Sequence, residues 1–238
     1  MIRFVLPLAA AAIAAVPAAA ADVQVTSQGP IVELAVTETV KAKPDIAEVS
    51  AGVTSEAPTA VAAMQANAQA MDAVVARIKA LGIRDEDIQT TGISLGAQYD
   101  YDNQGRNRPI FRAYQASNRV SVILRKVPDT GRVLDALVAA GATDLNGPSF
   151  SIDDDTAPRA QARKAAFDKA QTQAAEYARW AGFSGVRLLA VNEGHNPGRP
   201  MPMAGRDMAA SVEAKDTVVE PGLVGTSVTV SVTFEMTR

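Results

Sequence analysis

The sequence has 238 residues, 47% of them hydrophobic, and a formal net charge of −3. This composition is typical of a chain that buries a core, and it argues against intrinsic disorder. Because no basic stripe is present, we expect no nucleic-acid partner. The absence of cysteine excludes thiol nucleophiles, CxxC redox chemistry and cysteine-rich metal sites.

Residues 1–21 have the pattern of a secretion signal. Arg3 precedes an apolar stretch over 4–16, and Ala19-Ala20-Ala21 is a small-x-small triplet of the kind that signal peptidase accepts. We therefore expect cleavage after Ala21 and a periplasmic mature chain with no transmembrane helix, with association with the envelope left open. A retained anchor is the alternative, but the apolar stretch is short for a stable membrane span.

Hydrophobic periodicity predicts the first three elements. Alternation predicts strands over 31–40 and 46–54, and Pro44 marks the turn between them because it cannot donate to a strand ladder. A change to steps of three and four residues predicts a helix over 59–81, closed by Gly82. The expected buried face of this helix consists of Val61, Met64, Ala68, Met71, Val75, Ile78 and Leu81.

The second half of the chain continues in the same way. Two strands over 88–101 and 111–124 are expected to form a long hairpin, because turn residues lie between them. The remaining predictions are a helix over 128–140, a strand over 145–152, a helix over 156–181, strands over 186–192 and 227–236, and a mobile loop near 194–221. The expected buried stripe of the last helix is Phe167, Ala170, Ala174, Tyr177 and Ala181.

The order of these elements indicates the fold class. Strands come in adjacent pairs separated by three helices, which is typical of an α+β fold. We expect a largely antiparallel sheet with the three helices packed mainly on one face. No composition shift marks a boundary, so residues 22–238 are interpreted as a single domain.

Residues capable of catalysis or metal binding are few. The single histidine, His195, falls in the expected mobile loop without a G-x-S-x-G motif, which argues against a serine hydrolase. Copper(I) binding would require His195 with Met201, Met203 and Met208. Calcium binding at 153–155, or at Asp100, Asp102 and Gly105, lacks the full loop pattern. Helix capping and hairpin-turn chemistry explain these acids, so no catalytic, cofactor or metal residue is assigned.

The predicted hairpin carries the most suggestive residues. Aromatic and arginine side chains alternate there, and both types are enriched in protein interfaces. We therefore expect the hairpin to contribute oligomer contacts, while packing of the aromatics onto the chain's own core is the alternative. The candidate contact residues are Tyr99, Tyr101, Arg106, Arg108, Phe111, Arg112 and Tyr114.

Several segments in a fixed order resemble the SIMPL-domain family of bacterial periplasmic and envelope proteins. They are VKAKPDIAEV (40–49), DIQT (87–90), ISL (93–95), YQASN (114–118), GAT (141–143), FSI (150–152), YAR (177–179) and VTVSVTF (228–234). The resemblance implies an α+β fold, export, self-assembly into rings or larger oligomers in some members, and a link to oxidative-stress defence. It implies no catalytic residues, because none are established for the family.

Together these features favour a non-enzymatic, self-assembling periplasmic envelope protein, ring-like or channel-like and linked to oxidative-stress protection. The alternative is a periplasmic binding or carrier module for a small ligand or a metal. An enzyme of unrecognised type is a third hypothesis.

Overall fold

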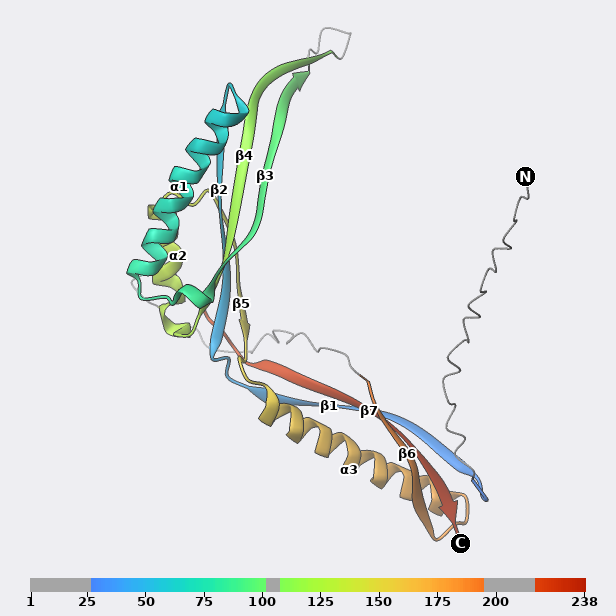
Figure 1. Cartoon of the computed structure of the whole chain (residues 1–238). Helices are drawn as coiled ribbons and strands as arrows, with labels where there is room; N and C mark the ends of the chain where they lie inside the picture. The colour runs from blue at the N-terminus through green and yellow to red at the C-terminus, as the bar shows by residue number, and fades with distance from the viewer. Residues whose placement is uncertain (1–26, 102–107, 195–216) are drawn as a thin grey trace, which may run out of the picture.

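The computed structural model describes residues 27–101, 108–194 and 217–238 (Figure 1). The expected signal peptide, the tip of the hairpin and most of the expected loop at 194–221 lie outside these residues. The elements in chain order are β1 (Ile31–Ala42), β2 (Ile46–Ala57), α1 (Ala60–Ala80), η1 (Asp85–Asp87), β3 (Ile88–Tyr101), β4 (Pro109–Leu124), η2 (Val127–Asp129), α2 (Thr130–Ala139), β5 (Asp144–Ser151), α3 (Thr156–Trp180), β6 (Gly185–Glu193) and β7 (Val224–Thr237).

The predicted α+β class is confirmed, and the strands divide into two sheets. One sheet has the order β3-β4-β2-β5 and the other β1-β7-β6, with every pairing antiparallel. The chain leaves the second sheet at the end of β1 and enters the first at β2, at the turn expected around Pro44. Helices α1 and α2 cover one face of the first sheet, and α3 covers one face of the second (Figure 1).

Each sheet has its own hydrophobic core, because its strands alternate apolar and polar residues. The core of the first sheet includes Val49 and Val122 of the strands and Ile78 and Leu137 of α1 and α2. The core of the second sheet is built differently, since α3 contributes mainly small side chains spaced four residues apart. These side chains, which allow the helix to approach β1 and β7 closely, are Ala162, Ala166, Ala170 and Ala174.

The expected stripe of α3 was therefore only partly right. Ala170 and Ala174 are fully buried, but Tyr177 is 45% exposed and packs against Trp180 on the outer side of the helix. The buried position belongs to Ala178, one residue further on. The reason is that the sheet selects the residues of smallest volume, whereas the prediction gave weight to the larger apolar ones.

Helix α1 begins at a side-chain cap and contains one buried polar residue. The Thr59 hydroxyl accepts a hydrogen bond from the Ala62 backbone N–H at 3.2 Å. Asn67 is 2% exposed, and its amide nitrogen donates to Val53 O at 2.8 Å and to Ala116 O at 3.0 Å. This side chain therefore connects α1 to two strands of the sheet by hydrogen bonds.

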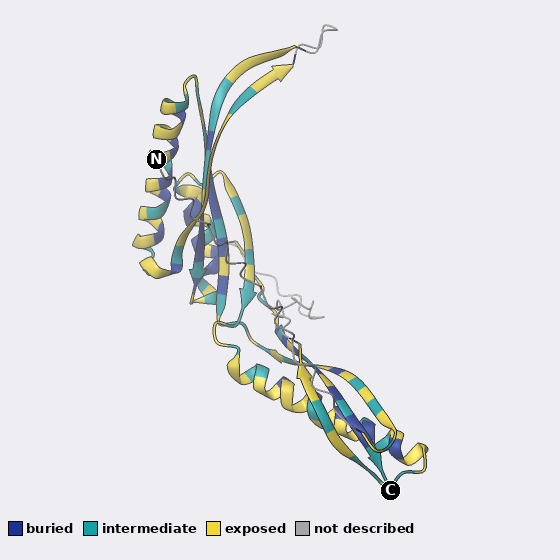
Figure 2. Cartoon of the chain, turned by 45° about the vertical axis from the view of Figure 1, so that its right-hand side comes forward, coloured by how far each residue is buried: buried dark blue, intermediate teal, exposed yellow. Residues whose placement is uncertain are grey.

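The hairpin formed by β3 and β4 extends beyond the helices as an arm. Figure 1 shows both strands continuing past the first turn of α1. Figure 2 shows that the far part of the arm is mainly exposed or half-buried, in contrast to the buried strand segments beside α1. Within the described residues, none of the helices has the length and apolar content needed to cross a membrane.

Candidate functional site on the hairpin arm

One face of the arm carries apolar side chains that no other element covers among the described residues. Residues paired across antiparallel strands stand on the same face of a sheet. Leu95 pairs with the buried Ala116, so the two side chains stand on the same face of the sheet. Nearer the core, α1 covers this face. The same face carries further exposed apolar residues along β3 and β4. We call this set, consisting of Ile93, Leu95, Tyr99, Tyr101 and Phe111, the arm face; its members are 45–60% exposed.

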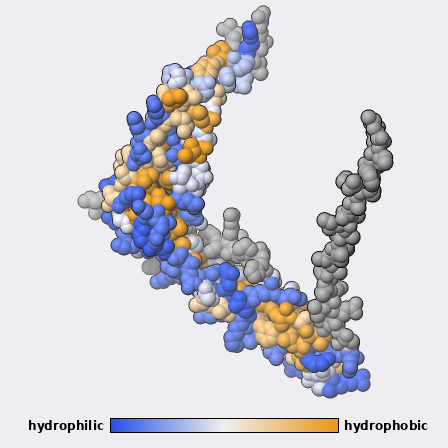
Figure 3. Space-filling model, in the orientation of Figure 1, coloured by the Kyte–Doolittle hydropathy of each residue, from blue (hydrophilic) through white to orange (hydrophobic). Residues whose placement is uncertain are grey.

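Three of the predicted contact residues form an aromatic cluster on the arm. The rings of Tyr99 and Phe111 meet edge to face with centroids 6.0 Å apart. The centroids of Phe111 and Tyr114 are 5.2 Å apart. Such packing fixes ring orientations while roughly half of the Tyr99 and Phe111 surfaces remains exposed. Figure 3 shows hydrophobic surface along this part of the molecule among hydrophilic residues.

The arginines of the predicted set do not join the aromatic cluster. Arg112 forms an ion pair with Glu56 of β2 at 2.6 Å, with both side chains substantially exposed. Arg108 is exposed and immediately precedes the arm strand β4. Arg106 lies outside the described residues. The arm therefore combines an apolar cluster with charged groups at its border.

The outer edge of β3 is the least protected of the four sheet edges in the described chain. Folded proteins block exposed edges with charges, lysine or proline, because open strands pair with other chains. Strand β3 has 14 residues and one charge, Asp100. The other edge strands carry more such residues, which are Pro148 and Asp144 in β5, Glu33, Glu38 and Lys41 in β1, and Arg187 and Glu193 in β6.

A network of ion pairs lies at the opposite end of β3. The Asp87 side chain is 5% exposed, and it accepts hydrogen bonds from Arg84 at 2.8 Å and Arg125 at 3.0 Å. These bonds, first from Arg84 and then from Arg125, hold the pKa of Asp87 below its ordinary value of 3.8. Arg125 also pairs with Asp153, whose backbone N–H donates to the Asp45 carboxylate at 2.8 Å. The network therefore connects the start of β3, which is the foot of the arm, to the turn between β1 and β2, which links the two sheets.

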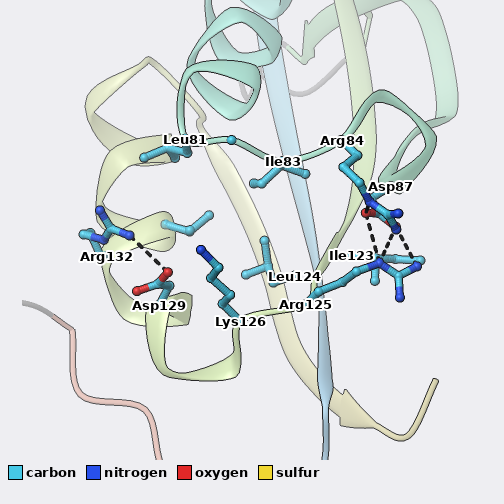
Figure 4. A pocket seen from close by; sticks show the side chains of 12 residues that line it. Leu81, Ile83, Arg84, Asp87, Ile123, Leu124, Arg125, Lys126, Asp129 and Arg132 are labelled. Carbon is cyan, nitrogen blue, oxygen red and sulfur yellow. Dashed lines mark hydrogen bonds and ion pairs between the residues drawn. The ribbon is translucent and has the colours of Figure 1, made fainter. Parts of the chain in front are cut away.

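Beside this network is a hollow of about 210 Å³, shown in Figure 4. It lies between the end of α1, the end of β4 and the start of α2. Its apolar lining includes Leu81, Ile83, Leu124 and Val133, and its charged lining consists of Arg84, Asp87, Arg125, Lys126, Asp129 and Arg132.

Comparison with known proteins places this architecture in a family. The model of the SIMPL family, described as a protein of unknown function (DUF541), matches residues 32–234. The chain belongs to the SIMPL family. This SIMPL protein is 31% identical over 225 residues to the 26 kDa periplasmic immunogenic protein of Brucella melitensis, covering 92% of this chain and 90% of the relative. It is 28% identical over 171 residues to the uncharacterized protein YggE of Escherichia coli K12, covering 72% of this chain and 68% of that relative.

Two of the acids considered for calcium, Asp154 and Asp155, have local partners in this SIMPL protein. The Asp154 carboxylate accepts from the Thr156 backbone N–H at 3.0 Å, and Asp155 pairs with Arg159 at 2.6 Å. No group of three or more histidine, cysteine or acidic residues that could hold a metal occurs in the described part of the chain. The other residues considered for metal binding, namely Asp102, Gly105, His195, Met201, Met203 and Met208, lie outside that part.

Sequence reasoning missed two features of the site. Ile93 and Leu95 appeared as ordinary strand residues. They alternate with Gly92, Ser94 and Gly96, a pattern that already indicated one apolar face and one face of small residues. Asp87 belongs to an Asp-Glu-Asp run that has the composition of a solvated turn. Arg84 lies only three residues before Asp87, but Arg125 comes from the end of β4, so the local sequence indicates one ion pair and not the network.

Two buried carboxylates predict loss of stability in acid. Hydrogen bonds from Arg187 and from the Gln28 backbone N–H hold the pKa of Glu235 below its ordinary value of 4.5, as the two arginines do for Asp87. A carboxylate with a lowered folded-state pKa stabilises the fold above its unfolded pKa and loses this contribution as pH falls through the folded value. We therefore expect urea midpoints to fall from about pH 5 downward, through the ordinary pKa range of both groups.

Asp87→Asn provides the check on this assignment. The variant lacks the titrating group, so its stability is expected to be lower near neutrality and to change less between about pH 5 and about pH 3 than that of the wild type. Asp85→Asn is the matched control, because the Asp85 side chain is 79% exposed. Equal acid sensitivity of Asp87→Asn and the wild type would contradict the role of Asp87.

Proposed function

We propose that this protein is an exported, non-enzymatic periplasmic protein that assembles with copies of itself through the arm. The observation that carries the proposal is the combination of an apolar arm face with the nearly uncharged edge of β3. Burial of exposed apolar area is the main favourable term in association, and an open edge supplies backbone hydrogen bonds to an added strand. Each molecule of this protein is surrounded by identical copies, so a second copy of the chain is the natural partner.

The periplasmic location rests on two supports. Residues 1–21 have the pattern of a secretion signal, with cleavage proposed after Ala21. A relative that shares 31% identity over 90% of its own length is named a periplasmic protein. The proposed working form is therefore residues 22–238, acting as a single domain.

The form of the assembly follows from which surfaces meet. Pairing of β3 with β3 of a second copy would give a two-fold dimer. A ring-like or channel-like assembly, which the family resemblance implies, requires the arm to contact a different surface of the next copy. We propose the ring, together with the implied part in protection against oxidative stress. We place the predicted contact residues Tyr99, Phe111 and Tyr114 at the centre of the proposed contact, with Tyr101, Arg108 and Arg112 at its border. Arg106, also a predicted contact residue, lies outside the described residues.

The absence of cysteine makes this proposal directly testable. In a Leu95→Cys variant, the single thiol is expected to react slowly with a maleimide when the protein is concentrated, and faster on dilution, because neighbouring copies cover the arm face. Val138→Cys is the matched control, since Val138 is an exposed apolar residue of α2 away from the arm. Equal, concentration-independent rates at both positions would contradict assembly through the arm.

A further inference from the structure

The hollow at the foot of the arm combines an apolar floor with a cation that has no counterion. The side chains of Leu81, Ile83 and Leu124, labelled in Figure 4, form this floor. Val133 also lines the hollow. At roughly 30 Å³ for each water molecule in the liquid, 210 Å³ corresponds to about seven water volumes. The hollow therefore has room for a short hydrocarbon chain with one polar head.

The arginines of the lining already contact carboxylates. Arg84 and Arg125 share the buried Asp87, and Arg132 contacts Asp129 at 3.1 Å. These contacts also balance the two acids of the lining, so neither carboxylate is left unpaired beside the hollow. Arg132 uses one of its five N–H donors in the Asp129 contact, which leaves donors for a ligand.

Lys126 differs from these arginines. Across residues 27–101, 108–194 and 217–238, no hydrogen bond or ion pair involves its amino group, which Figure 4 shows directed into the hollow. Lys126 is exposed, so water screens the attraction of its ammonium group to an anion, and the apolar side chains beside it must add binding free energy by covering a hydrocarbon chain. The single unpaired amino group of Lys126 therefore matches a ligand that carries one negative charge.

We propose that this hollow binds a small monoanionic amphiphile, a carboxylate with a short unbranched hydrocarbon chain. Lys126 binds the carboxylate, Arg132 donates a further hydrogen bond, and the hydrocarbon lies on Leu81, Leu124 and Val133. An inorganic anion gains nothing from the apolar floor, and an uncharged alcohol gains nothing from Lys126. The site is separate from the arm face, so it does not depend on self-assembly.

Equilibrium dialysis of the mature chain with radiolabelled hexanoate tests this inference, and its readout is valid at any assembly size. Hexanoate is expected to bind at millimolar concentration, more tightly than hexan-1-ol, acetate or inorganic phosphate. Lys126→Met is expected to weaken binding roughly twofold to fivefold, the effect of losing one exposed ion pair. Lys126→Arg keeps the charge and should retain most of the affinity.

Lys41→Met is the matched control, because Lys41 is an exposed lysine of β1 outside the hollow. Unchanged circular dichroism and urea midpoints for Lys126→Met would show that its fold is intact. The proposal is overturned if hexanoate does not bind, if Lys126→Met binds it as well as the wild type, or if phosphate binds equally tightly.

Discussion

The double variant Ile93→Ser, Phe111→Ser is expected to dissociate the assembly while leaving the subunit folded. Both side chains are about half exposed in the isolated subunit, at 59% and 46%, so little of the subunit core is lost. In the assembly, each becomes buried, and truncation of a buried apolar contact residue costs about 2 kcal/mol. Two such losses raise the dissociation constant by about a thousandfold. Light scattering at micromolar concentration should therefore detect mainly monomer.

Val138→Ser is the control for this experiment, because it removes an equally exposed apolar side chain from α2. Its native mass should equal that of the wild type. If the double variant kept the wild-type mass while remaining folded by circular dichroism, the arm face would not be the contact.

Replacing Asn67 with alanine is expected to lower the free energy of unfolding by about 2–4 kcal/mol. The amide of Asn67 donates to the carbonyls of Val53 and Ala116 at 2.8 and 3.0 Å in a position that is 2% exposed. The variant loses two hydrogen bonds and leaves both buried carbonyls without that donor. Urea denaturation of the purified variants measures the change.

Two further substitutions distinguish this role from a general effect on the helix. Asn67→Asp keeps the size but replaces the donor by an acceptor facing two carbonyls, so we expect at least as large a loss. Gln65→Ala alters an exposed amide on the same helix and should change stability by no more than about 0.5 kcal/mol. A similar effect of Asn67→Ala and Gln65→Ala would show that the two hydrogen bonds contribute little.

The elements of the fold could be predicted from the sequence because their signals are local. The change from alternation to helical spacing near Thr59, and the glycines after α1 and α2, fixed those helices to within a few residues. Asn67 was missed because the predicted buried face of α1 ran through Val61, Met64 and Ala68, which are exposed in the structure. The helix in fact turns Ala63 and Asn67 toward the sheet, where space is short.

The division into two sheets could not be predicted because it depends on pairing between distant segments. Strand β1 pairs along its whole length with β7, the last strand of the chain. Nothing in the alternation of either strand specifies its partner, since register is set by burial of the matching faces. The aromatic cluster of the arm was visible in the sequence. The hollow around Lys126 instead assembles residues from the segment after α1, the end of β4 and the start of α2, and it has no local signature.

The native mass of the unaltered mature chain, residues 22–238, tests the central claim most directly. Size-exclusion chromatography with light scattering at micromolar concentration should give a native mass that is a whole multiple of the subunit mass. This native mass should decrease on dilution. A mass equal to one subunit at every concentration would contradict the proposal that the exposed edge and the arm face bring copies of this chain together.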